Sequence, residues 1–165
     1  MFALLALPAL ACPDYAHQPA LLRDLEPTAS RGLLTDDDKK CLEENFAVAT
    51  EQTTKNKISR VELVNAYALD TSTWADLVQR HLDQIDRSDP DMAYLYAFYL
   101  FNTDKTNATE VVKWCDTALE RKQVWEGDVF VSRVYGLMKL RTVAAQQRWK
   151  LEEDKVARQD SASLH

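Results

Sequence analysis

The sequence predicts an all-α protein built from stacked antiparallel helical hairpins, with a long helix at the C-terminus. Apolar residues recur at spacings of three and four along most of the chain, which is the periodicity of amphipathic helices. Signatures of helix N-termini occur at intervals along the chain. Glycine is scarce, with three residues, and four of the five prolines lie in the first 27 residues. A sheet protein with many tight turns would need more of both.

The N-terminal residues predict an export signal. Residues 2–11 are apolar and end in the small-x-small pattern Ala9-Leu10-Ala11, directly before Cys12, as at a cleavage site. We expect residues 1–11 to be a signal peptide of an exported protein, either periplasmic or membrane-anchored. Leu10-Ala11-Cys12 also resembles a bacterial lipoprotein signal, which makes Cys12 a candidate lipidation site and membrane tether. A cytoplasmic protein that retains residues 1–11 as a packed helix remains the alternative.

Residues 12–34 predict a mostly irregular arm, because they contain three prolines and Gly32. A short helical turn is expected at residues 19–25. The arm either lies over the body through its leucines or serves as a flexible tether. We expect residues 35–158 to form one helical-repeat domain and residues 159–165 to form a frayed tail.

Helix starts divide this domain into hairpins. A capping residue followed three positions later by an acid occurs at four places: Thr35, Ser59, Thr73 and Asn107. Pro90 opens a further helix, where its missing N–H costs nothing. We therefore predict hairpins over residues 59–89 and 90–122. Residues 128–158 form either one long helix or a hairpin bent near Arg141.

The two hairpins repeat each other. With a shift of 33 residues, one set of apolar positions in the second helices matches another: Val78, Leu82 and Ile85 match Val111, Cys115 and Ala118. Ala68 and Leu100 are similarly placed in the first helices. A period in the low thirties is typical of stacked helical repeats.

The segment EVVKWCDTALERK at residues 110–122 resembles the second helix of a tetratricopeptide repeat, and Tyr135-Gly136 resembles a pair in the first helix of that repeat. The resemblance covers about residues 59–149. It implies an α-solenoid whose concave surface holds a peptide or a partner helix.

A non-catalytic protein–protein interaction scaffold is therefore the expected function. Candidate partner contacts are four of the aromatic residues of the segment 92–101, because aromatic side chains are natural hot spots: Tyr94, Tyr96, Phe98 and Tyr99. A core role for these four residues remains the alternative. The alternative function is a structural or assembly subunit of a bacterial envelope complex, tethered as a lipoprotein.

Other function classes are disfavoured. A net charge of −6 argues against nucleic acid as the partner. Glu43-Glu44 and His81 with Asp83 are the nearby acid–base pairs, and no nucleophile accompanies them, so we expect no enzyme. Three histidines and no CxxC predict neither a metal site nor a cofactor. We expect Cys41 and Cys115 to be buried free thiols, with a bond between them as the alternative if Cys12 is lipidated.

Overall fold

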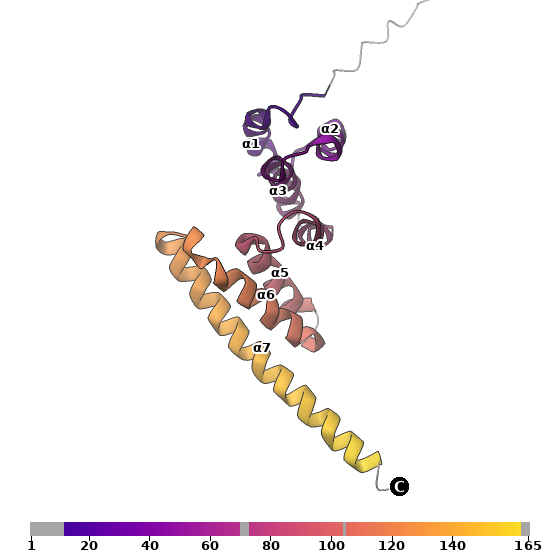
Figure 1. Cartoon of the computed structure of the whole chain (residues 1–165), viewed down its shortest axis with the longest axis vertical. Helices are drawn as coiled ribbons and strands as arrows, with labels where there is room; N and C mark the ends of the chain where they lie inside the picture. The colour runs from indigo at the N-terminus through magenta and orange to yellow at the C-terminus, as the bar shows by residue number, and fades with distance from the viewer. Residues whose placement is uncertain (1–11, 70–72, 104, 163–165) are drawn as a thin grey trace, which may run out of the picture. The chain divides into compact units, whose positions relative to one another are not determined.

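A computed structural model of the chain describes residues 12–69, 73–103 and 105–162. These residues form α-helices and short 3-10 helices and no strand, so the predicted all-helical class and the long C-terminal helix are confirmed (Figure 1). The chain divides into two compact units, with the boundary after Trp74. The predicted export signal, residues 1–11, lies outside the described residues.

Unit 1 contains four helical elements: η1 (Pro19–Asp24), α1 (Glu26–Ala29), α2 (Asp36–Val48) and α3 (Gln52–Ala68). Helix α3 packs against the other three. Nine buried residues form its core: Tyr15, Ala16, Leu22, Ala29, Leu34, Leu42, Ala49, Ile58 and Val61. Five of the nine precede residue 35, so residues 12–34 belong to the folded unit and are not a flexible tether. No boundary separates residue 34 from residue 35, and the turn expected at residues 19–25 is η1.

The helix starts agree in part with the predicted caps. The Thr35 hydroxyl accepts the Asp38 N–H at 3.1 Å, and the Asp38 carboxylate accepts the Thr35 N–H at 2.9 Å. Helices α4 and α6 begin directly after Thr73 and Asn107. The start predicted at Ser59 is wrong: α3 begins at Gln52, and Ser59 is buried inside it. The polar run at residues 51–57, expected to end a helix, instead leads into α3 and forms its first turns.

Unit 2 contains α4 (Trp74–Gln84), whose first residue belongs to unit 1, followed by five elements: α5 (Pro90–Thr103), η2 (Lys105–Asn107), α6 (Ala108–Glu120), η3 (Lys122–Val124) and α7 (Gly127–Ala162). Helix α6 packs against both α5 and α7. The hairpin predicted over residues 59–89 is therefore divided, because α3 lies in unit 1 and α4 lies in unit 2.

The predicted repeat positions are buried where they fall in second helices. All six side chains lie in the interior: Val78, Leu82, Ile85, Val111, Cys115 and Ala118. The first-helix positions differ, because Leu100 is buried and Ala68 is exposed. The spacing thus identified the inward faces of α4 and α6 and failed for α3.

Helix α7 is one continuous helix of 36 residues, about 54 Å long at 1.5 Å per residue. The bend considered near Arg141 is absent. Its first half packs on α6 and α5 through Leu137, Leu140 and Ala144, which are buried. No described side chain of α7 beyond Ala144 is buried, and the C-terminal part of α7 continues past the N-terminal end of α6 (Figure 1). Residues 159–162 of the predicted tail are helical, and residues 163–165 lie outside the described residues.

Gly136 marks the close approach of α7 to α5. A Cβ atom at this position would lie 3.5 Å from Cζ of Phe98, which is ordinary van der Waals contact. The glycine of the predicted Tyr135-Gly136 pair therefore faces α5, while Tyr135 on the same helix is exposed.

A buried polar pair joins α4 to α5. His81 Nε2 lies 3.2 Å from Asp89 Oδ2, and both side chains are buried. The other carboxylate oxygen of Asp89 accepts the backbone N–H groups of Asp91 at 3.0 Å and Met92 at 3.2 Å. Asp89 therefore caps α5 and pairs with the histidine of the preceding helix at the same time.

The substitution Asp89→Ala is expected to lower the free energy of unfolding by about 2–4 kcal/mol, because it removes a helix cap and leaves polar groups in the interior unsatisfied. Urea unfolding followed by circular dichroism measures this loss. Asp83→Ala removes the same charge from an exposed position on α4, and its effect is expected to stay within about 0.5 kcal/mol. Equal effects of the two substitutions would contradict the structural role of Asp89.

Candidate interaction surfaces

The four aromatic residues predicted as partner contacts are all half-buried on α5. They form two pairs on different faces of the helix. Tyr94 and Phe98 are four residues apart and Tyr96 and Tyr99 are three apart, and residues at these spacings are neighbours on a helix surface. The structure therefore does not bring the four rings into one patch.

The first pair holds the start of α7 against α5. The Tyr94 ring lies 4.9 Å from the Phe98 ring and 6.3 Å from the Trp125 ring. The Arg133 guanidinium lies 5.3 Å from the Tyr94 ring centre and 5.2 Å from that of Trp125. Arg133 also pairs with Asp91, which accepts the Trp125 indole N–H at 2.9 Å. These contacts give Tyr94 and Phe98 a structural role.

The second pair packs toward α6 and α4. The Tyr96 ring stacks on Tyr99 at 6.2 Å and meets Trp114 edge-to-face at 5.6 Å. The Tyr96 hydroxyl donates to Gln79 at 3.3 Å. Burial, followed by nearby acids such as Asp83, raises the pKa of Tyr96. Only parts of these two rings remain at the surface.

A larger apolar surface lies on α7. Six positions, here called the α7 stripe, alternate in spacing between four and three: Val131, Tyr135, Met138, Thr142, Ala145 and Trp149. The exposed fraction is 65% for Val131, 70% for Tyr135, 58% for Met138 and 70% for Trp149. Because a 3.5-residue spacing keeps side chains on one side of a helix, these residues form one continuous seam. The seam is distinct from the buried face of α7 at Leu137, Leu140 and Ala144.

Two shallow depressions lie along this seam, on either side of Trp149. One, of about 430 Å³, is lined by Arg141, Thr142, Ala145, Gln146 and Trp149. The other, of about 540 Å³, is lined by Trp149, Glu152, Glu153, Val156 and Ala157. Each contains four residues at positions i, i+3, i+4 and i+7, which is the arrangement that receives one side chain of a facing helix.

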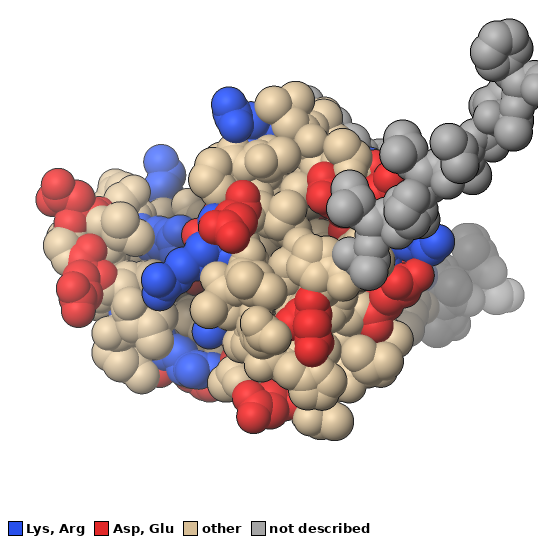
Figure 2. Space-filling model, turned by 90° about the horizontal axis from the view of Figure 1, so that it is seen from above, with Lys and Arg blue, Asp and Glu red and all other residues tan. Residues whose placement is uncertain are grey.

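The charged residues around the stripe are all basic. Residues 129–151 contain five Lys or Arg and no Asp or Glu, although the whole chain has a net charge of −6. Arg141 pairs with Asp116 on α6, and Arg133 pairs with Asp91. Among the described residues, Lys139, Arg148 and Lys150 have no ion-pair partner. On the face shown in Figure 2, Lys and Arg lie among Asp, Glu and uncharged residues.

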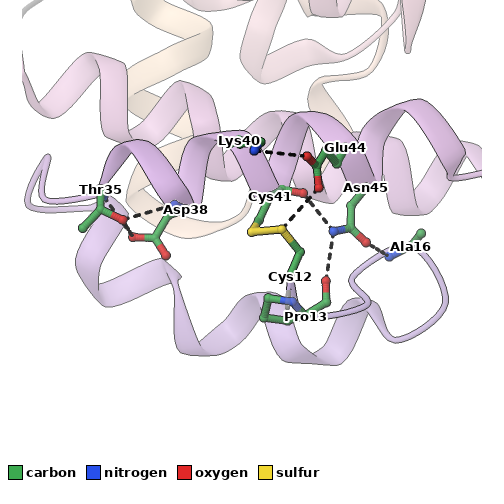
Figure 3. Close-up of a disulfide and its surroundings, with 9 residues drawn as sticks. All are labelled: Cys12, Pro13, Ala16, Thr35, Asp38, Lys40, Cys41, Glu44 and Asn45. Atoms are coloured by element: carbon green, nitrogen blue, oxygen red, sulfur yellow. Dashed lines mark hydrogen bonds and ion pairs between the residues drawn. A yellow bond between two sulfur atoms is a disulfide. The ribbon is translucent and has the colours of Figure 1, made fainter. Parts of the chain in front are cut away.

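The candidate lipidation site Cys12 forms a disulfide with Cys41 of α2 (Figure 3). The Asn45 side chain holds the same segment, since it accepts the Ala16 N–H at 2.9 Å and donates to the carbonyls of Pro13 at 2.9 Å and Cys41 at 2.8 Å. Carboxylate oxygen Oε2 of Glu44 lies 3.3 Å from the Cys12 sulfur, a contact without a hydrogen bond, because a disulfide sulfur carries no hydrogen.

The disulfide corrects the prediction for Cys41, which is neither a free thiol nor a partner of Cys115. The N-terminal segment folds back onto α2 and brings Cys12 to it, although the two cysteines are 29 residues apart. Cys115 is a buried free thiol, as predicted. Burial raises the pKa of its thiol to about 12, so Cys115 stays protonated and unreactive at neutral pH.

Unit 1 also contains a half-open pocket of about 880 Å³. Elements η1, α1 and α3 contribute most of its lining, which combines apolar and charged side chains, among them Leu21, Val61, Val64, Arg23, Lys57, Arg60 and Glu26. His17 at this pocket pairs with Asp14 at 2.9 Å, and the Ser30 hydroxyl donates to the Pro27 carbonyl. The pocket therefore brings no hydroxyl nucleophile to a base.

His81 pairs with Asp89 and not with Asp83, and Glu43 and Glu44 are exposed on α2. The described residues hold no group of three or more His, Cys, Asp or Glu that could bind a metal ion. Of the helices described, none combines the length and apolar character that crossing a bilayer requires.

Comparison with known proteins adds no relative: no family model, curated protein or solved structure matches this chain.

Sequence reasoning missed the α7 stripe, although its signal was present in the sequence. The alternation of four and three continues from Val131 to Trp149. Composition concealed it, because residues 142–158 are mostly polar and Trp149 is the one aromatic residue among them.

Counting the reactive thiols tests the disulfide directly. In the oxidised folded protein, Ellman's reagent is expected to find no reactive thiol, since Cys115 is fully buried. In denaturant without reductant, it is expected to find one thiol of the three cysteines. Three thiols in denaturant would contradict the Cys12–Cys41 bond.

Reduction is expected to lower the free energy of unfolding by about 3–4 kcal/mol, because the bond closes a long loop in the unfolded chain. Urea unfolding with and without reductant measures the change. The double variant Cys12→Ser/Cys41→Ser retains Cys115 and serves as the control, because reductant should leave its unfolding curve unchanged.

Proposed function

We propose that this chain is a non-catalytic protein–protein interaction scaffold, and that the α7 stripe is its principal contact surface. The observation that carries the proposal is the exposure of four large apolar side chains, Val131, Tyr135, Met138 and Trp149, on one side of a single helix. Isolated exposed apolar residues are normal on protein surfaces, whereas a contiguous apolar surface is typical of an interaction site.

The packing of unit 2 supports a scaffold role. Helix α7 rests on α6 and α5 through a separate buried face, so its own unit does not need the stripe for its core. The proposed scaffold is of the tetratricopeptide-repeat-like kind, supported by the packing of α5, α6 and α7 and by the buried repeat positions of α4 and α6. The half-buried rings of Tyr96 and Tyr99 serve at most as a secondary contact.

The proposed site of action is an oxidising compartment outside the cytoplasm. The Cys12–Cys41 disulfide supports this proposal, because such bonds form and persist in oxidising environments. A lipid thioether on Cys12 would use the sulfur that the disulfide uses, so the two modifications exclude each other. The disulfide therefore favours an exported protein without a tether over a lipoprotein subunit of an envelope complex.

Site-specific photo-crosslinking tests the proposal. A photo-crosslinking amino acid at Met138 is expected to give a discrete adduct with a partner protein in the native cells, because Met138 lies in the centre of the stripe. The same amino acid at Val129, which is 50% exposed on the same helix but outside the stripe, is expected to give none. Absence of an adduct at Met138, or identical adducts at both positions, would overturn the proposal.

A further inference from the structure

We infer that the α7 stripe docks an amphipathic partner helix whose apolar seam is flanked by acidic residues. This inference rests on the proposed function and names the chemistry of the partner. It is drawn from three properties of α7: the spacing of the stripe, the depressions along it and the charges beside it.

The spacing selects a helix as the occupant. Successive stripe residues alternate between four and three positions, which is the spacing of a two-helix seam. The side chains form a row, with Thr142 and Ala145 between the larger Met138 and Trp149. An interfacial helix that lies on a membrane presents a broad apolar face instead. The stripe is narrow and is interrupted in its continuation by Glu152.

The depression before Trp149 fits the same occupant, and the depression after it, bounded by two glutamates, marks where the basic part of the seam ends. One is bounded by Thr142, Ala145, Gln146 and Trp149, and the next by Trp149, Glu152, Glu153 and Val156. They follow each other at an interval of seven residues, as the holes of a coiled coil do. Between Val131 and Trp149 the seam is about 27 Å long at the helical rise, so it can contact a partner helix over several turns.

The charges beside the seam select an acidic partner. In a two-helix seam, the residues that flank the apolar positions face the flanks of the partner helix. Lys139 and Arg148 occupy these flanks between Val131 and Trp149 without an ion-pair partner among the described residues, and Arg141 lies there paired with Asp116 of α6. No Asp or Glu of α7 lies between Val131 and Trp149. Acidic flanks on the partner would therefore complement α7, while basic flanks would be repelled.

The same charges disfavour a second copy of this chain. In a parallel pair in register, Glu152 would face its own copy within the seam. In an antiparallel pair centred between Met138 and Thr142, Lys139 and Arg141 would each face their own copies. Both arrangements place like charges together, which opposes self-association.

Peptide binding to the full-length protein tests the inference. Two synthetic helices of about four heptads share a leucine seam and differ in their flanks, which are all glutamate in one and all lysine in the other. We expect the glutamate-flanked peptide to bind at least about tenfold more tightly, by fluorescence anisotropy of labelled peptide. Raising NaCl from about 50 to about 500 mM should reduce this difference, because salt screens exposed charges.

Matched variants locate the binding. Val131→Glu places a charge in the stripe and is expected to weaken binding of the glutamate-flanked peptide at least about tenfold. Val129→Glu makes the same change two residues away, outside the stripe, and is expected to leave the affinity within about twofold. Both positions are exposed, so neither variant should disturb folding, and circular dichroism checks this.

Several results would overturn the inference. Equal binding of the two peptides, binding of neither, or indifference to Val131→Glu would each contradict an acidic helix as occupant. A dimer in sedimentation velocity that Val131→Glu disperses would identify a second copy instead. Binding to anionic lipid vesicles that depends on Val131 would identify a membrane. If the Met138 crosslink persists while the peptides fail, the proposed function stands and only the partner chemistry is wrong.

Discussion

The packing of α7 against α6 and α5 is the contact on which the arrangement of unit 2 depends. Leu137, Leu140 and Ala144 supply the buried face. Arg141 pairs with Asp116 of α6, and Arg133 pairs with Asp91 of α5. These contacts hold the first half of α7, and the uninterrupted helix carries that orientation to Ala162. A second face of the same helix is thereby presented to solvent at a fixed angle to the first.

The core of unit 1 depends on a different feature, the packing of residues 12–34 over its helices. Its helices α2 and α3 are polar on average, and they gain a core because residues 12–34 fold back over them. The Cys12–Cys41 bond and the buried Asn45 amide fix that return. Covalent closure restricts the unfolded chain, and the amide satisfies backbone groups that would otherwise be buried without partners. The same bond makes the sulfur of Cys12 unavailable for other chemistry.

Local signals predicted the features that depend on neighbouring residues. The Thr35 capping box, the start of α6 after Asn107 and the buried stripes of α4 and α6 all follow from spacings within one or two turns of helix. Contacts between distant residues could not be predicted in this way. Pairing of Cys12 with Cys41 requires a chain reversal that no short pattern specifies, and Pro13 and Pro19 favoured an irregular arm.

The same distinction between local spacing and distant contacts holds for the candidate interaction surfaces. The aromatic content of α5 predicted Tyr94 and Phe98 as partner contacts. Their structural role depends instead on Trp125 and Arg133, which lie further along the chain. The α7 stripe was readable from spacing alone, yet its exposure was not. Only the position of α5 and α6 against Leu137 and Leu140 shows which of the two apolar faces of α7 stays uncovered.

Hydroxyl-radical footprinting of the oxidised full-length protein, alone and in its native cells, tests the exposure of the stripe most directly. Met138 and Trp149 are predicted to oxidise rapidly in the isolated protein and to be protected in cells, where a partner covers them. Met92, Trp114 and Trp125 are buried within the same chain and should be protected in both states. Protection of Met138 and Trp149 in the isolated protein, or equal oxidation of these two residues in both states, would contradict the account.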